Sequence, residues 1–259
     1  MTTRTIGVNL GVALGGRRWL WLVGGLAGLW LFARHLTNPW DIVMSATQQN
    51  PVTFVVIPLY LFLQPADLLN PWQSLTALRL GSTRVWWWTH VAAAGLLAGL
   101  LAGGLAAAAG IVALASGRWS WQWGRFGHLS EYPAVLAREP WSVPWHYGLI
   151  ALGFLFGGLW AVGVLRLALT LWWQGPWMAW LAVVTLGLLT VALSNTVLQG
   201  VVWWLPGAQF SFYYHWTPVG SRTVSWTLGY TPLLATVAAA AGLWMADQPP
   251  WHAPQGEAP

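Results

Sequence analysis

Long apolar runs, separated by short charged or proline-containing stretches, dominate this sequence. A transmembrane helix needs about 20 mainly apolar residues, with a range of about 17–25. Charged residues bracket five runs that reach this length, the first of them only when it is extended through Gly15 and Gly16. The five intervals are 18–34, 41–67, 84–118, 139–166 and 222–247.

The interval between Arg166 and Arg222 contains no charged residue, and its length predicts more than one pass. Gly175-Pro176 interrupts it early, because proline removes a backbone donor and breaks a helix. A further helix is therefore expected from Trp177 to about Gly200. The pattern predicts an all-α, polytopic integral membrane protein: one six-helix transmembrane domain over residues 1–247, then a disordered cytoplasmic tail over 248–259.

A more polar segment separates the second and third expected spans. Residues 68–85 are predicted to form a short amphipathic helix on the cytoplasmic side. Asn70-Pro71 is typical of a helix start, and Leu75, Leu78 and Val85 are available to contact lipid or a partner protein.

Composition strengthens the membrane interpretation. Of the 259 residues, 57% are hydrophobic and 7% are charged, whereas soluble domains carry about 25% charged residues. All 11 basic residues are arginines scattered between apolar runs, so nucleic-acid binding is rejected. The absence of cysteine excludes disulfides, thiolate metal sites and cysteine nucleophiles.

The arginine distribution predicts the orientation. Short cytoplasmic loops carry an excess of basic residues. Arg17 and Arg18 precede the first span and outweigh Arg34 after it, and Arg79 and Arg84 lie in the next loop on the same side. Both termini are therefore expected in the cytoplasm.

Tryptophan and glycine mark the ends and the packing faces of the expected helices. The 24 tryptophans include Trp86–Trp88 and Trp172, which we interpret as interfacial anchors. Small residues four apart let membrane helices approach closely. Gly24 with Gly28, and Gly95 with Gly99 and Gly103, therefore predict helix-packing or dimer interfaces, with ordinary packing inside the bundle as the alternative.

Arg166 is the charge placed deepest in an apolar run. Ionisable residues inside a membrane are functional candidates. Trp172 and Trp173 follow shortly afterwards, so the alternatives are that Arg166 snorkels to the inner boundary or forms a structural ion pair.

No catalytic, metal or ATP-binding signature occurs in the sequence. There is no G-x-S-x-G elbow, H-E-x-x-H pair or G-x-x-x-x-G-K-[ST] loop. The histidines lack the spacing of a haem or copper site, and we interpret them as interfacial hydrogen-bonding groups. We therefore expect no catalytic, cofactor or metal residues in this chain.

One stretch carries a resemblance to a known family. Residues 78–87 read Leu-Arg-Leu-Gly-Ser-Thr-Arg-Val-Trp-Trp, which is similar to an R-x-G-S-x-R-x-W-W pattern in ABC-2 type permeases, the membrane subunits of type V ABC transporters. The layout agrees over most of the chain: an arginine pair before the first span, a Gly/Ala-rich third helix, and a Pro-interrupted loop over 195–222. The outer loop over 118–144 is longer than a minimal permease of this group would have.

The resemblance implies a mechanism and partners. A homodimer or heterodimer of permeases in a bacterial plasma membrane would bind a separate ATPase, which holds ATP and Mg²⁺, and would export an amphiphilic peptide, lipid-like or drug-like substrate. Leu75, Leu78, Arg79 and Arg84 would form the ATPase-coupling surface. Positive-inside anchoring without a partner is the alternative for the two arginines.

Two other functions remain open from the sequence. A membrane-embedded redox or cofactor-binding subunit would use His128, His146 and His215 near the outer face. A non-catalytic assembly or immunity factor would act by binding another membrane protein, without any ATPase.

Overall fold

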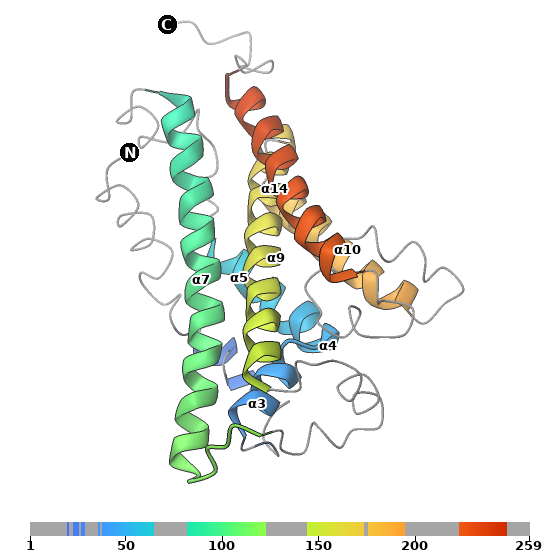
Figure 1. The fold of residues 1–259 in the computed structure, drawn as a ribbon. Helices are drawn as coiled ribbons and strands as arrows, with labels where there is room; N and C mark the ends of the chain where they lie inside the picture. The colour runs from blue at the N-terminus through green and yellow to red at the C-terminus, as the bar shows by residue number, and fades with distance from the viewer. Residues whose placement is uncertain are drawn as a thin grey trace, which may run out of the picture.

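The computed structural model of this chain describes Leu20, residues 23–25 and 27–28, Leu36, and residues 38–64, 82–122, 144–173, 176–194 and 223–247. These parts are helical with short turns and contain no strand, which confirms the all-α class. Figure 1 shows the elements: α3 (Pro39–Ala46), α4 (Gln49–Pro51), the π-helix η1 (Val52–Val56), α5 (Ile57–Leu63), α7 (Thr83–Ala115), α9 (Pro144–Trp173), α10 (Pro176–Ser194) and α14 (Thr223–Asp247). The predicted tail over 248–259 lies outside the described residues.

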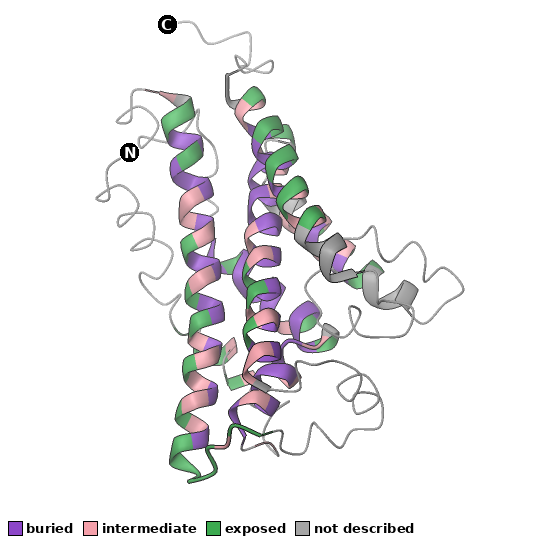
Figure 2. Cartoon of the chain, viewed as in Figure 1, coloured by how far each residue is buried: buried purple, intermediate pink, exposed green. Residues whose placement is uncertain are grey.

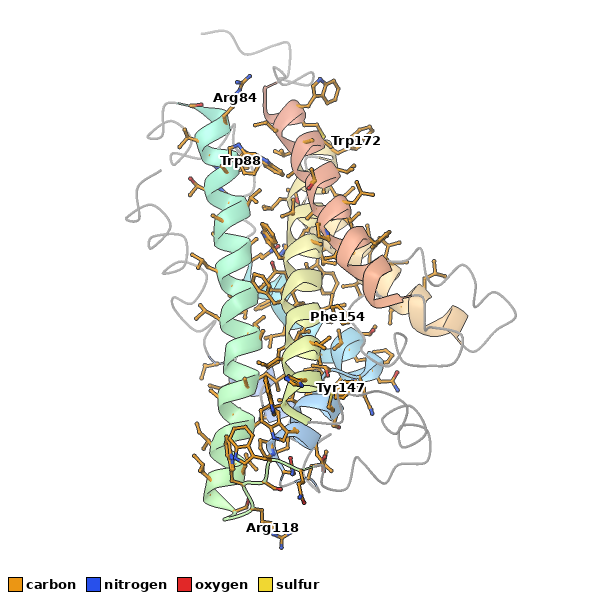
Figure 3. All side chains as sticks on the ribbon, in the orientation of Figure 1. Arg84, Trp88, Arg118, Tyr147, Phe154 and Trp172 are labelled. Carbon is orange, nitrogen blue, oxygen red and sulfur yellow. The ribbon has the colours of Figure 1, made fainter. Side chains whose placement is uncertain are left out.

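Two long apolar helices, α7 and α9, form the frame of the molecule. α7 has 33 residues and α9 has 30, and they are the two helices of the described parts that are long and apolar enough to cross a membrane. They run antiparallel: Arg84 and Trp172 lie at one end of the molecule, and Arg118 and Tyr147 lie toward the other (Figure 3).

The C-terminus of α7 is defined by a glycine in the left-handed region. Gly117 has φ 65°, which a residue without a Cβ adopts without strain. The Gly117 N–H donates to the Leu114 carbonyl at 3.1 Å, and the Arg118 N–H donates to the Ala113 carbonyl at 3.0 Å. This bond pair is the Schellman motif, which satisfies carbonyls that a helix end leaves open.

The predicted continuous span between residues 41 and 67 is wrong, because the structure divides it into α3, α4, η1 and α5. Proline explains the irregular turn: Pro58 lacks an N–H, and its ring clashes with the carbonyl four residues earlier. The ladder widens there, and the Ile57 N–H donates to the Val52 carbonyl five residues back. Proline also ends the segment. Pro65 follows Gln64, whose backbone is extended with ψ 121°, as a residue before proline prefers.

The predicted break at Gly175-Pro176 is confirmed. α9 ends at Trp173, and α10 begins at Pro176, where proline suits the first helical position because the N–H it lacks would be unpaired anyway. α14 coincides with the last predicted helix. Shorter apolar helical stretches lie over 52–63, 180–189 and 229–245, and two helices of the described residues are long and apolar enough to cross a membrane. The six-helix bundle stays a prediction.

The core lies on both sides of α9. One hydrophobic cluster joins η1 and α5 to α7, α9 and α10, and a second joins α7, α9 and α14. Figure 2 shows the consequence, with buried residues facing this centre and exposed residues on the outer sides of α7 and α14. Trp86 and Trp87 belong to the second cluster and are 0% exposed, which corrects their prediction as interfacial anchors; Trp88 and Trp172 are exposed.

The packing of α14 on α7 depends on one glycine. A Cβ placed on Gly242 would overlap the Trp87 ring, whereas a Cβ on Gly103 would meet nothing within 4 Å. We predict that Gly242→Ala destabilises the protein by about 1–3 kcal/mol through overpacking. Gly103→Ala, the matched control, should be neutral or slightly stabilising because alanine is the better helix former. Thermal melting of both variants in detergent checks this; equal melting temperatures would contradict the close packing at Gly242.

Candidate functional site

Of the four residues predicted to form the ATPase-coupling surface, the structure describes one, Arg84. Leu75, Leu78 and Arg79 lie outside the described residues. Arg84 lies in the first turn of α7, exposed at one end of the molecule (Figure 3). Because α7 begins at Thr83, Arg84 and Val85 belong to the long helix, and the amphipathic helix predicted over 68–85 extends too far at its C-terminal end.

The predicted glycine interfaces separate into inward and outward positions. A Cβ on Gly95 would lie 3.2 Å from Trp160 Nε1, and one on Gly99 would lie 3.7 Å from Phe156 Cε2. These two glycines therefore pack against α9 of the same chain. A Cβ on Gly28 would be 3.7 Å from Val55 Cγ1, in ordinary contact, whereas Gly24 and Gly103 meet nothing within 4 Å.

Arg166 lies inside the bundle and not at its boundary. Its side chain, on α9, is 3% exposed. Guanidinium Nη1 donates to the main-chain carbonyl of Leu61 and, at 3.3 Å, to Gln64 Oε1. Neither alternative predicted for Arg166 is found: it does not snorkel, and within the described parts of the chain its partners are a carbonyl and an amide instead of a carboxylate.

The Leu61 carbonyl needs this donor for a reason visible in the sequence. In a continuous helix it would accept the N–H four residues later, but that residue is Pro65, which has no N–H. Within the described residues the last turn of α5 is closed by the Gln64 N–H, which donates to the Tyr60 carbonyl at 3.2 Å. A carbonyl buried away from water costs free energy when it is unpaired. Arg166 pairs it, and its positive charge also suits the negative end of the helix dipole.

Tyr60 and Gly163 fix the geometry around Arg166. Tyr60 and Gln64 are four residues apart and lie on one face of α5. The Tyr60 hydroxyl donates to the Ala94 carbonyl at 3.0 Å, which joins α5 to α7. A Cβ on Gly163, one turn before Arg166, would overlap the Tyr60 hydroxyl. Gly163 therefore lets α5 approach α9 closely enough for Arg166 to reach Leu61.

Two donors of this cluster are left over. Arg166 Nε is buried and has no hydrogen-bond partner among the residues that the structure describes, and Gln64 Nε2 lies beside the Tyr60 hydroxyl without a hydrogen bond of good geometry. Gln64 itself is 5% exposed. A buried donor without an acceptor carries a desolvation cost of about 1–3 kcal/mol, or more when it is charged. The cluster thus combines a full positive charge with an excess of donors, which is the chemistry of an anion site.

The Arg118 end of the molecule is organised by the start of α3. Asn38 caps α3 by accepting the Trp40 N–H at 3.0 Å, and its amide donates to the Gln122 carbonyl at 2.8 Å. The Trp40 indole donates to the Ser120 carbonyl at 3.1 Å, and its ring lies 5.9 Å from that of Trp121. The first residues of the predicted outer loop are therefore docked on α3.

The described histidines do not converge. His90 lies near the start of α7, where its Nδ1 is 2.9 Å from the Trp86 carbonyl. His146 lies at the start of α9, which is the opposite end of the molecule (Figure 1). Within the described ranges no three His, Cys, Asp or Glu side chains group as metal ligands would. His128 and His215, named for the cofactor alternative, lie outside those ranges.

Comparison with family models, curated proteins and solved structures finds no match to this chain.

Reading the sequence for charges alone missed Tyr60, Gln64 and Gly163. A signal for them was present, because Tyr60 and Gln64 are polar residues at helical spacing in an apolar run, and Gly163 lies one turn before Arg166.

The cap on α5 makes a stability prediction. Arg166→Leu leaves the Leu61 carbonyl without its donor, so we expect destabilisation of about 1–3 kcal/mol. Arg166→Lys keeps a charge and a donor and should lose less. The temperature at which half of each purified variant leaves the monodisperse peak in size-exclusion chromatography measures the difference; equal losses for leucine and lysine would exclude the capping role.

Proposed function

We propose that this chain is the membrane-spanning permease subunit of an ATP-driven transporter, similar to the ABC-2 type, which works with a separate ATPase. It crosses a bacterial plasma membrane six times with both termini in the cytoplasm. It exports an amphiphilic substrate and binds no cofactor itself, since ATP and Mg²⁺ belong to the partner ATPase.

Exposed apolar faces support membrane insertion. Soluble monomers rarely expose large contiguous apolar patches, yet large aliphatic and aromatic side chains are exposed along α7 and α14. They include Leu96, Leu100, Ile111 and Leu114 on α7, and Leu233, Val237 and Trp244 on α14. Lipid is the environment in which these faces are stable.

The alternating direction of the segments supports a multi-pass topology. The segment from α3 to α5 runs from the Arg118 end toward the Arg84 end, α7 returns, and α9, α10 and α14 continue the alternation (Figures 1 and 3). A chain that crosses a membrane repeatedly must alternate in this way. Arg84 marks the cytoplasmic end in this proposal, in agreement with the arginine bias.

The single observation that carries transport is the buried Arg166 at the end of a broken helix. Ionisable groups inside membrane bundles mark substrate pathways. Discontinuous helices also supply the binding sites of many transporters, because their free backbone groups face an interior site. Here the π-helix η1 directly precedes α5, which ends at Leu63 and offers the Leu61 carbonyl to Arg166.

The position of Arg84 supports the binding of a partner ATPase. It lies exposed in the first turn of α7, at the proposed cytoplasmic end. Together with Arg79, Leu75 and Leu78 it would present a basic and apolar surface to acidic groups of an ATPase. Gly24 and Gly103, which have open space beside them, suit the second permease of a dimer.

We predict that an ATPase co-purifies with the tagged full chain from its native membrane. Arg79→Glu combined with Arg84→Glu should reduce the recovered ATPase at least tenfold, because like charges would then oppose the acidic partner. The measurement is ATP hydrolysis and mass spectrometry of the eluate.

Arg118→Glu is the matched control, since it reverses an exposed arginine at the opposite end of α7. It should leave recovery of the ATPase unchanged. Recovery of no ATPase with the unsubstituted chain contradicts the transporter proposal. An equal loss in the Arg118 variant contradicts only the assignment of the docking end.

A further inference from the structure

No acidic side chain in the described parts of the chain balances the charge of Arg166, and this charge bears on what the proposed transporter carries. We propose that Arg166 and Gln64 bind the anionic head group, a carboxylate or a phosphate, of an amphiphilic substrate. This inference rests on the proposed transport function and names its substrate class.

The charge of Arg166 is the first observation that favours an anion. Arg166 is a permanent cation buried in the bundle. The dipole of α5 offsets only about half a charge at its C-terminal end. No carboxylate in the described parts of the chain contacts Arg166, whose hydrogen-bond partners there are Leu61 and Gln64. An anion between α5 and α9 would complete the neutralisation.

The hydrogen-bond donors of Arg166 and Gln64 also favour an anion. Arginine has five N–H donors and no acceptor, and Nη1 is already used. Among the described residues Arg166 Nε is a buried donor without a partner, and Gln64 Nε2 lies beside the Tyr60 hydroxyl without a hydrogen bond of good geometry. Carboxylates and phosphates accept several charge-assisted hydrogen bonds from such a fork. A neutral alcohol, or a cation, would leave the charge or the donors unmatched.

Apolar residues surround Arg166 and favour an anion that carries an apolar tail. Arg166 lies on α9 between the two hydrophobic clusters. Leu61 and Val162 belong to the first, and Leu167 and Ala168 to the second. These buried side chains would become apolar surface for an alkyl or aromatic tail only when α5 moves away from α9, and a small inorganic anion would leave that surface unused.

Access follows from the irregular segment. Arg166 and Gln64 are buried, so the head group reaches them only when α5 moves away from α9. The π-helical turn Val52–Val56 precedes α5, and such turns are frequent at functional sites because their hydrogen-bond ladder is irregular.

The test is a calorimetric titration of the purified full chain in neutral detergent with four decyl probes: decyl phosphate, decanoate, decanol and decyltrimethylammonium. We expect both anions to bind at least tenfold more tightly than decanol, and the cation to bind more weakly than decanol. Inorganic phosphate should compete poorly. Competition as strong as that of decyl phosphate would overturn the amphiphile assignment.

Gln64→Glu is the decisive variant, because it places a carboxylate of the same shape beside Arg166. It should fold and resist heat at least as well as the original chain, yet lose the tenfold anion preference. Arg166→Gln should lose the preference too. Arg118→Gln changes the net charge by the same single unit at an exposed site and should keep it. A folded Gln64→Glu protein that binds decyl phosphate like the original chain overturns the proposal.

Asp67, three residues after Gln64 and outside the described residues, provides a second test, because its carboxylate could neutralise Arg166 in place of a substrate anion. If the original chain shows no anion preference and Asp67→Asn acquires one, Arg166 is already neutralised within the chain, and the proposal is wrong. These titrations need no ATPase. Anion binding without a co-purifying ATPase therefore rejects the transporter alone, and ATPase binding without an anion preference rejects the substrate class alone.

Discussion

The structure depends on one hydrogen bond, from the Arg166 guanidinium to the Leu61 carbonyl. Its cause is covalent: Pro65 stands where the helical N–H for that carbonyl should be. In a medium without water an unpaired backbone group costs several kcal/mol, so a donor must come from another helix. α9 supplies it, and this requirement fixes both the height and the rotation of α9 against α5. Gly163 and the Tyr60 hydroxyl then fit into the remaining space.

The same complementarity between a missing side chain and a large one recurs along α9 and α14. Gly95 on α7 receives Trp160, whose indole donates to the Val91 carbonyl at 3.0 Å. Gly148 on α9 faces Trp40, with a built Cβ 2.8 Å from the ring, and Gly242 on α14 faces Trp87. Where lipid competes with side chains for apolar contact, close van der Waals packing of this kind holds helices together. The abundance of tryptophan and the abundance of glycine therefore have a common explanation in parts of this chain.

Local rules predicted much of the fold. The apolar runs marked α7, α9 and α14, and Gly175-Pro176 marked the end of α9, because length, charge and proline act within a few residues. The same rules failed between residues 41 and 67, where charge spacing suggested one span. There Pro58 and Pro65 decide the backbone, and their effect is visible only when each carbonyl is matched with its donor. Trp86 and Trp87 were misassigned for a related reason. Nearness to a helix end suggests an interface, but α14 covers them, and contacts between distant segments are not encoded by position in a run.

The candidate site could likewise be predicted only in part from the sequence. Arg166 was identifiable because a charge in an apolar run is conspicuous, but its partners lie 102 and 105 residues away in the sequence. Burying a permanent charge carries a desolvation cost that a neutral hydrogen-bond donor at this position would avoid. Capping alone does not require arginine, since a hydroxyl or an amide could donate to Leu61. What arginine adds is a permanent charge and further donors, both held inside the bundle by Gln64 and the end of α5. Stability of the closed bundle accounts for the hydrogen bond to Leu61, but it does not account for the charge, and recognition of an anion does.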